Sequence, residues 1–355
     1  MEADIQWMKR ALHLAGYGRG NVSPNPMVGC VIVHDGLIIG EGWHRQYGGP
    51  HAEVRAVEDA EEKGNGHLLE HATAYVTLEP CSHTGKTPPC ADLLIRKKLK
   101  RVVICNDDPN PLVSGRGVRR MSDAGIEIET KLLEEEGLAL NKRFFTSMVE
   151  KRPYVILKWA ETADGFLGSA IGAQVRISGP LSNMRVHQWR AEEDAILVGY
   201  KTALLDNPKL NVRHWSGRNP VRIVLDRYLR LPNHLHLFDG SQHTDVVNYE
   251  KQSTFSGEPE RYNGTPGTSY LQIVPGDNEI AQLLEGLRSR GIQSVFVEGG
   301  AAVINAFLNA GLWDEIRRCQ GAQKLGEGVV APTPRGTLTG SEKVQDDLWT
   351  YYSKI

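Results

Sequence analysis

Apolar residues along the first 150 positions follow helical and strand periods in turn. Residues 4–16 place apolar side chains on one helical face before two glycines, which predicts a surface helix. The apolar run 28–33, followed by Asp35-Gly36 and a second apolar run, predicts a hairpin of two strands. Further strands are predicted at 74–78, 102–105 and 126–129, with helices starting at His51, after Cys90, at 115–124 and at 132–148. Strands that alternate with helices predict a layered α/β domain.

A second α/β series follows a break at Lys151-Arg152-Pro153. Proline ends the preceding helix and biases its neighbour towards extended backbone, so we place a domain boundary after Glu150. The stretch 250–269 is rich in Ser, Gly, Pro and Thr and is typical of a long surface loop. Strands are predicted from 154 to 159, at 195–198, at 222–226, near Val246 and at 294–298, and helices at 181–193, 278–290 and 301–310. The pattern therefore predicts two α/β domains, residues 1–150 and 151–355.

Composition narrows the class of protein. A chain of 355 residues is longer than a single hydrophobic core usually supports. A content of 40% hydrophobic and 24% charged residues is typical of globular proteins. A net charge of -2 offers no basic surface to a polyanion, so we expect no nucleic-acid partner. The absence of a signal-peptide pattern or a long apolar run predicts no membrane association. Five cysteines, odd in number and sparse, argue against a disulfide framework and predict a cytoplasmic protein.

One group of residues suits metal-assisted hydrolysis. His51, Cys81 and Cys90 supply three ligands that zinc prefers, and a catalytic zinc keeps its fourth position open for water. Glu53 is not needed as a ligand, and a carboxylate there takes the water's proton and passes it to a leaving group. This spacing resembles the zinc deaminase signature, in which His-x-Glu is followed by Pro-Cys-x-x-Cys. We expect His51 and Glu53 in the first turn of one helix.

The second cysteine departs from that signature, because it lies nine residues after the first instead of three. The longer interval inserts a polar and cationic loop that is well placed to contact a substrate larger than a bare base. The alternative is a structural zinc site or two unrelated buried cysteines. Glu53 at its required offset, and Pro80 before Cys81, favour the deaminase interpretation.

With both halves considered, the chain resembles the bifunctional riboflavin-biosynthesis deaminase-reductase family, which processes a diamino-hydroxy-phosphoribosylamino-pyrimidine. In the first half the resemblance rests on residues 24–30, 49–53, 79–90 and 108–111. It implies a cytidine-deaminase-like three-layer domain that binds Zn2+ through the histidine and two cysteines named above, with Glu53 as proton shuttle. It also implies substrate contacts from Asn25, His83 and Lys86.

The second half resembles the family's NADPH-dependent reductase domain, which has a dihydrofolate-reductase-like fold. The matching segments are residues 157–158, 164–165, 190–191, 202, 206–208, 210–213, 222–226 and 297–300. The resemblance implies that the cofactor is contacted by Ala160, Thr202, Asp206 and Gly300. It implies that the substrate is contacted by Gln174, Arg190, Leu210, Arg213 and Glu298.

Elementary chemistry agrees with part of that assignment. Arg190 and Arg213 suit a ribose phosphate through bidentate guanidinium contacts, and Gly299-Gly300 before a helix is a ready phosphate seat. Taken alone, a glycine pair usually marks only a turn and surface arginines are mostly solvated. Arg227 follows a predicted strand, where it could meet a cofactor 2'-phosphate and favour NADPH over NADH.

Two positions depart from the family pattern. Arg176 stands at an expected cofactor contact where the family often has an aromatic residue. After Glu315 an expected apolar strand is replaced by Arg317-Arg318-Cys319-Gln320, and the remaining tail is polar. Burying that segment as a strand would leave two charges without partners, so we expect an irregular, shortened or exchanged C-terminal edge.

These observations predict two consecutive reactions, a hydrolytic deamination of the pyrimidine and a hydride transfer from NADPH to the open-chain ribosyl group. Lys158, Asp206 and Glu298 are the polar candidates near the second step. We expect a small-molecule substrate and a homo-oligomer. One alternative is a nucleic-acid base deaminase with an accessory domain, which the acidic net charge disfavours. Another is a deaminase whose reductase half has become a ligand-binding or assembly module.

Overall fold

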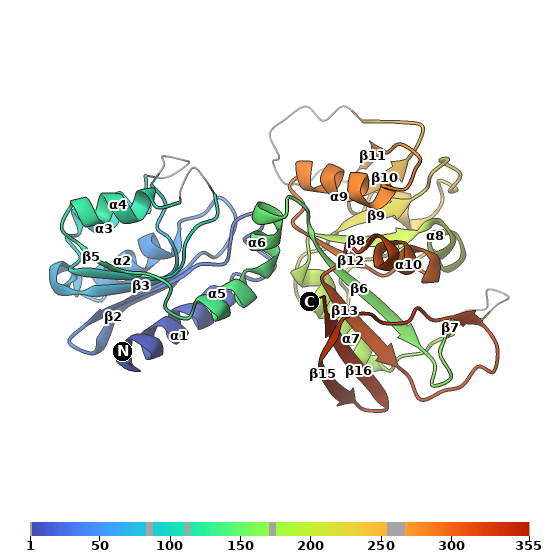
Figure 1. Ribbon diagram of the computed structural model, residues 1–355, viewed down its shortest axis with the longest axis horizontal. Helices are drawn as coiled ribbons and strands as arrows, with labels where there is room; N and C mark the ends of the chain where they lie inside the picture. The colour runs from blue at the N-terminus through green and yellow to red at the C-terminus, as the bar shows by residue number, and fades with distance from the viewer. Residues whose placement is uncertain (1, 83–87, 111–113, 170–174, 254–266, 355) are drawn as a thin grey trace. The chain divides into compact units, whose positions relative to one another are not determined.

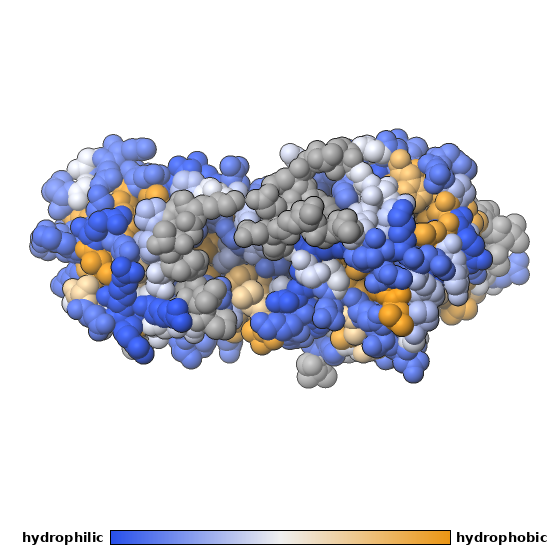
Figure 2. Space-filling view, turned by 90° about the horizontal axis from the view of Figure 1, so that it is seen from above, coloured by the Kyte–Doolittle hydropathy of each residue, from blue (hydrophilic) through white to orange (hydrophobic). Residues whose placement is uncertain are grey.

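The computed structural model describes residues 2–82, 88–110, 114–169, 175–253 and 267–354. The chain divides into two compact units, residues 1–150 and 151–355, and each is described by itself (Figure 1). Figure 2 shows a largely hydrophilic face on which apolar residues form separate small areas. Among the described residues, no helix has the length and apolar character needed to cross a membrane.

The first unit is built on a five-stranded sheet with the order β2-β1-β3-β4-β5. β1 runs antiparallel to β2 and β3, and β3, β4 and β5 are parallel. The strands are β1 (Gly29–His34), β2 (Leu37–Trp43), β3 (Thr73–Leu78), β4 (Arg101–Asn106) and β5 (Glu127–Glu129). The helices are α1 (Glu2–Gly16), α2 (Ala52–Glu62), η1 (Gly66–His71), α3 (Cys90–Arg96), α4 (Arg116–Asp123), α5 (Glu134–Leu140) and α6 (Lys142–Val149).

Side chains that alternate along these strands form two cores. Ile32, Val76 and Ile104 pack on one face of the sheet with apolar residues of α2, α3 and α4. Val31 and Val103 pack on the other face with α1. Because both faces are covered, the strands read as continuous apolar runs, and the predicted three-layer arrangement is confirmed.

A glycine allows α1 to approach the sheet closely. A Cβ added at Gly29 in β1 would lie 2.0 Å from the carbonyl oxygen of Ala11 in α1. No real side chain fits at that distance, so glycine is needed for the helix and strand backbones to pack together. β1 begins just after Asn25, so the position of this strand also helps to place Asn25.

The single helix predicted at 132–148 is wrong, because the structure has two helices that meet at Asn141. The Asn141 side-chain amide accepts a hydrogen bond from the Met27 amide at 2.8 Å and donates one to the Met27 carbonyl at 2.9 Å. Asn141 is buried and has a non-helical backbone conformation. A side chain that pairs with a distant backbone segment interrupts the helix, and no local pattern shows this.

The second unit is built on a nine-stranded sheet with the order β11-β10-β9-β8-β12-β6-β13-β16-β15. The strands from β11 to β13 in that order are parallel, and β13, β16 and β15 are antiparallel. The strands are β6 (Tyr154–Glu161), β8 (Ala195–Gly199), β9 (Val221–Leu225), β10 (Thr244–Asn248), β11 (Thr268–Gln272), β12 (Ser294–Val297), β13 (Glu315–Gln320), β15 (Thr337–Val344) and β16 (Asp347–Ser353). Two short strands, β7 (Phe166–Gly168) and β14 (Val329–Val330), pair separately.

Helices cover both faces of this sheet. One core joins the sheet to α9 (Glu279–Ser289) and α10 (Ala301–Ala310) through residues such as Leu287 and Phe307. The other core joins it to α7 (Pro180–Glu192) and α8 (Tyr200–Asp206) through residues such as Val186 and Ala203. A short helix η2 (His236–Phe238) contributes Leu237 to this second core.

The expectation of an irregular C-terminal edge is wrong. β13 is a regular strand between β6 and β16, although it carries Arg317 and Arg318. Arg318 forms an ion pair with Glu161 at 2.6 Å. Arg317 pairs with Glu315 at 2.6 Å, and its guanidinium carbon lies 4.4 Å from the centre of the Trp189 ring. Both charges therefore have partners, because β6 supplies Glu161, α7 supplies the aromatic face, and Glu315 lies on β13 itself.

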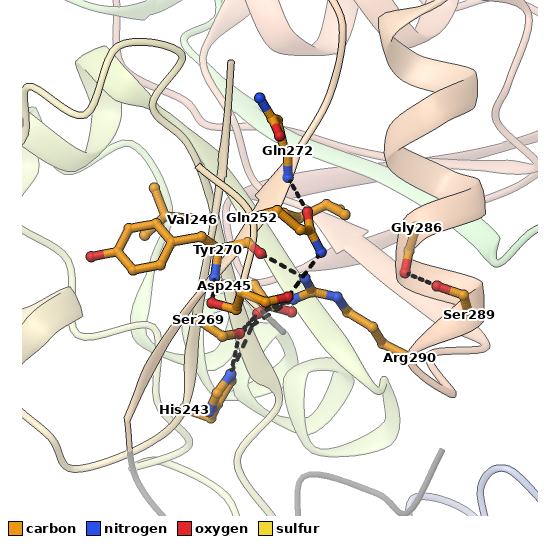
Figure 3. Close-up of polar contacts among 12 residues, drawn as sticks. His243, Asp245, Val246, Gln252, Ser269, Tyr270, Gln272, Gly286, Ser289 and Arg290 are labelled. Atoms are coloured by element: carbon orange, nitrogen blue, oxygen red, sulfur yellow. Dashed lines mark hydrogen bonds and ion pairs between the residues drawn. The ribbon is translucent and has the colours of Figure 1, made fainter. Parts of the chain in front are cut away.

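The far edge of the same sheet is held by a buried polar cluster (Figure 3). Arg290, which follows α9, donates a hydrogen bond of 2.6 Å to Asp245 in β10 and one of 2.8 Å to the Tyr270 carbonyl in β11. Asp245 is fully buried and Arg290 is only 3% exposed. Ser269 and His243 complete the cluster through a hydrogen bond of 3.0 Å. This cluster fixes α9 to the β10-β11 edge.

Candidate metal centre and reductase site

Three candidate metal-ligand atoms lie close together at the N-termini of α2 and α3 and just after β3. His51 is the N-cap of α2, Cys90 is the first residue of α3, and Cys81 lies in the segment that follows β3. The Nδ1 atom of His51 lies 3.6 Å from the Cys81 Sγ and 3.3 Å from the Cys90 Sγ. All three ligand atoms lie within 4.8 Å of one another, so the structure brings the predicted ligands together.

The geometry fits a zinc ion. Zinc bonds of about 2.3 Å to sulfur and about 2.1 Å to nitrogen place neighbouring ligand atoms of a tetrahedron about 3.6 Å apart. The two N···S distances agree with that separation. The Cys81 sulfur also accepts a hydrogen bond of 3.3 Å from the Cys90 amide. Hydrogen bonds from Cys90 and His51 lower the pKa of Cys81 to about 4, although burial opposes this, so a thiolate is ready for a cation.

Glu53 lies beside these ligands in the first turn of α2. Its side chain is 3% exposed, and burial raises its pKa to about 7, against the opposing charge of His51. A carboxyl group with a pKa near neutrality accepts and releases a proton readily under physiological conditions. The residue therefore has the proton affinity that a proton shuttle needs.

A neighbouring carboxylate holds the Cys81 segment in place. Glu79 is 4% exposed, and its two oxygens accept hydrogen bonds from the amides of Gly115 and Gly117 at 3.0 and 3.1 Å. These amides belong to the N-terminus of α4, where a negative charge is favourable. Glu79 thus anchors the chain two residues before a ligand.

Asn25 reaches the metal centre through a residue that the sequence analysis missed. Its Nδ2 atom lies 3.1 Å from the Nε2 of His44, and the Nδ1 of His44 lies 3.0 Å from the Pro50 carbonyl. The His44 ring packs edge-on against His51 at 5.5 Å. A single histidine after a strand has no distinctive sequence signal. His83 and Lys86 lie outside the described residues.

A buried ion network occupies the second unit. Glu298, just after β12, accepts hydrogen bonds from Arg190 in α7 at 2.7 and 3.1 Å, and Lys158 in β6 lies 3.5 Å away. All three side chains are 11–13% exposed. Burial opposes ionisation of Glu298, but the charges of Arg190 and Lys158 prevail and lower its pKa to about 2. The carboxylate is therefore charged at neutral pH.

The other expected substrate residues of this unit lie on the loop 210–213 or outside the described chain. Leu210 is buried in the core, whereas Arg213 is exposed and donates a hydrogen bond of 3.1 Å to the Asn211 side chain. Arg190 also donates one of 3.2 Å to the Asn211 carbonyl, so this loop is tied to α7. Gln174 lies outside the described residues.

Of the expected cofactor residues, Gly300 and Thr202 lie close together, and the others lie elsewhere in the unit. Gly300 is the N-cap of α10, and a Cβ added there would lie 3.4 Å from the Thr202 hydroxyl in α8. Asp206 ends α8, and Ala160 lies near the end of β6. The Arg176 carbonyl accepts a hydrogen bond of 2.9 Å from Gln323. Arg227 instead pairs with Glu279 of α9 at 2.7 Å.

The fold and the ligand triad define the class of protein as a zinc-dependent deaminase joined to a second α/β unit. The family model for the cytidine and deoxycytidylate deaminase zinc-binding region matches residues 1–106, and the RibD C-terminal domain model matches residues 153–352. The chain belongs to the RibD family of riboflavin biosynthesis proteins. It is a bifunctional enzyme with a zinc-binding deaminase domain and an NADPH-using reductase domain.

Relatives match over almost the whole chain. The riboflavin biosynthesis protein RibD of Aquifex aeolicus is 40% identical over 92% of this chain and 89% of its own length. That of Actinobacillus pleuropneumoniae is 41% identical over 94% of this chain and 87% of its own length.

Solved structures agree. A diaminohydroxyphosphoribosylaminopyrimidine deaminase/5-amino-6-(5-phosphoribosylamino)uracil reductase from Thermotoga maritima is 36% identical, with a TM-score of 0.88 over 100% of this chain and 99% of its own. RibD of Acinetobacter baumannii is also 36% identical, with a TM-score of 0.87 over the same shares. The alternative of a degenerate second half is therefore not favoured.

Proposed function

We propose that residues 1–150 deaminate a diamino-hydroxy-phosphoribosylamino-pyrimidine and that residues 151–355 then reduce its ribosyl group to a ribityl chain. The observation that carries the first assignment is the meeting of His51, Cys81 and Cys90 beside Glu53. The network around Glu298 supports the second.

In the deaminase, His51 Nδ1 and the two thiolates would hold Zn2+. When bound, zinc supplies an activated water as nucleophile and lowers the pKa of that water. Glu53 then takes a proton at its carboxylate and delivers it to the departing amino group, which leaves as ammonia. Burial suits Glu53 to this exchange, because its raised pKa lets it hold the proton between the two transfers. Asn25, His83 and Lys86 would orient the substrate.

In the reductase, NADPH supplies the hydride and the protein supplies position and charge. Gly300 at the start of α10 and Thr202 beside it would bind cofactor phosphate oxygens, since free amides at a helix N-terminus attract anions. Ala160, Arg176 and Asp206 remain proposed cofactor contacts. Arg227 remains a proposed 2'-phosphate ligand, and it would have to leave Glu279 to bind one.

The reductase substrate would lie against the Glu298 network. Arg190 and Arg213 would bind its phosphate, and Gln174, Leu210 and Glu298 would line the sugar and the base. Lys158, charged and close to Glu298, is a proposed polar group near the reacting carbon.

The cysteines and the net charge support a proposed location and substrate class. None of the five cysteines is in a disulfide, which supports a reducing, cytoplasmic environment. The acidic net charge supports a small-molecule substrate without a nucleic-acid partner. We also propose a homo-oligomer, which light scattering of the purified protein tests directly.

The decisive experiment follows ammonia release and NADPH oxidation in one sample, for the wild type and for Glu53→Ala. We expect the wild type to do both, and the variant to do neither until it receives the deaminated intermediate. Ammonia release by the wild type without NADPH oxidation, even with the intermediate supplied, would show that the second half is no reductase. Normal ammonia release by Glu53→Ala would remove the proposed proton shuttle.

A further inference from the structure

One histidine of the reductase unit has a buried ring nitrogen without a hydrogen-bond partner among the described residues. His187 lies in α7 and is fully buried. Its Nδ1 accepts a hydrogen bond of 3.2 Å from the Arg213 main-chain amide. An accepting Nδ1 in a neutral ring places the proton on Nε2. In the part of the chain that the structure describes, Nε2 is buried and has no hydrogen-bond partner.

The ring is neutral under physiological conditions. Burial, followed by the charges of Arg190, Arg213 and His214, lowers the pKa of His187 to about 4. The Nε2–H is therefore a permanent donor at neutral pH. A buried donor without an acceptor is costly and uncommon in native proteins, so it calls for a ligand that would satisfy it.

The groups around His187 indicate the charge of that ligand. Arg190 lies one turn after His187 in α7, and the main-chain amide of Arg213 donates a hydrogen bond to His187. Partial desolvation and the nearby charge of Arg190 lower the pKa of Arg213, as expected where two guanidinium groups lie close together. Glu298 is the carboxylate that contacts this group among the described residues, and it is shared with Lys158. Positive charge thus exceeds negative charge, as a phosphate-binding site requires.

Two contacts hold the loop 210–213 over this region. The Asn211 carbonyl accepts from Arg190, and the Arg213 amide donates to His187. The histidine therefore positions the loop that carries Arg213 through Nδ1, and the Nε2 of the same ring has no partner in the described chain.

We propose that the Nε2–H of His187 donates a hydrogen bond to the substrate's phosphate between Arg190 and Arg213. This inference rests on the proposed function, in which these two arginines bind that phosphate. It makes His187 a neutral specificity residue, which favours phosphorylated over unphosphorylated substrate without adding a third charge beside the arginines.

The two ring nitrogens can be separated by substitution. In His187→Asn an amide oxygen replaces Nδ1 as acceptor for the Arg213 amide, but the donor at Nε2 is lost. In His187→Gln the longer side chain places an amide nitrogen near the former Nε2 position. His243→Asn is the matched control, because His243 lies in the same unit and bonds to Ser269. Melting temperatures of all three variants report whether they fold.

The measurement is KM and kcat of NADPH oxidation with the deaminated intermediate and with its dephosphorylated form. A hydrogen bond to a charged phosphate predicts that His187→Asn raises KM for the phosphorylated substrate about 10-fold or more, with kcat within about twofold. With the dephosphorylated substrate, wild type and His187→Asn should have the same KM. His187→Gln should recover part of the loss, and His243→Asn should match the wild type.

Other outcomes overturn the inference. An equal rise of KM for both substrates would show that His187 only positions the loop, and an unchanged KM for both would show that Nε2 does not meet the phosphate. If the wild type oxidises no NADPH, the proposed function has failed, and inorganic phosphate then tests the site separately. Phosphate should raise the melting temperature of the wild type more than that of His187→Asn, and equal shifts would reject the site.

Discussion

Glu298 and Arg190 are 108 residues apart in the sequence and form two hydrogen bonds, of 2.7 and 3.1 Å. The pair joins the end of β12 to α7 at the proposed substrate site. Each side chain is 11% exposed, so neither charge is solvated well enough to stand alone. The pair therefore links the stability of this unit to its chemistry.

Replacing Glu298 by Gln keeps the shape and removes the charge. Arg190 and Lys158 would then be left near each other without a carboxylate. We expect the second unit to lose about 3 kcal/mol of unfolding free energy, the range for a broken buried pair. NADPH oxidation should fall at least about tenfold, equivalent to about 1.4 kcal/mol of transition-state stabilisation. Ammonia release in the same sample is the control, and its loss would indicate general misfolding.

The same carboxylate predicts a pH dependence of stability. The pKa of Glu298 is lowered from 4.5 to about 2, so the folded state favours its charged form. Its contribution is fully present above pH about 4.5 and is lost as the pH falls towards about 2. The difference in melting temperature between wild type and Glu298→Gln should therefore shrink between pH 5 and pH 3, as measured by calorimetry. A difference that stays constant over that interval would contradict the assignment.

Metal removal should abolish the deaminase activity only. A protein stripped by chelation should release no ammonia but should still oxidise NADPH when given the deaminated intermediate, and added zinc should restore the first activity. Cys90→Ala should bind no zinc, because only two of the three protein ligands remain. Cys105→Ala is the matched control, since Cys105 is a buried cysteine of the same unit that lies outside the triad. Metal content by atomic absorption distinguishes the two variants.

The ion pair between Arg318 and Glu161 should stabilise the C-terminal half of the second sheet. Glu161→Gln leaves Arg318 partly buried without its carboxylate, and we expect a loss of about 2 kcal/mol, below the range for a fully buried pair because the arginine is 21% exposed. The double variant Glu161→Gln with Arg318→Met should recover most of that loss, because no unpaired charge remains. Chemical unfolding curves test both. Equal stability of the two variants would mean that the pair contributes through packing alone.

The sequence by itself determined the fold class and the composition of the metal centre. The apolar runs of β1, β3 and β4 are continuous because helices cover both faces of the sheet, and such runs can be recognised in the sequence alone. His51 is the N-cap of α2 and Glu53 lies in its first turn, so the sequence places both residues at the same helix start. The residue types then point to zinc, since a histidine with two cysteines is a ligand set that zinc prefers.

Tertiary structure decided the features that depend on partners from distant segments. Asn141 interrupts a helical pattern because it pairs with Met27, 114 residues away. Arg318 is tolerated inside a sheet because Glu161 lies on the neighbouring strand. His187 reads in the sequence as one more polar residue of a helix, and only the fold brings the Arg213 amide to one of its nitrogens and leaves the other without a partner in the described chain. Hydrogen bonds and ion pairs act over a few ångströms, so a pattern along the chain cannot specify pairs that only folding brings within reach.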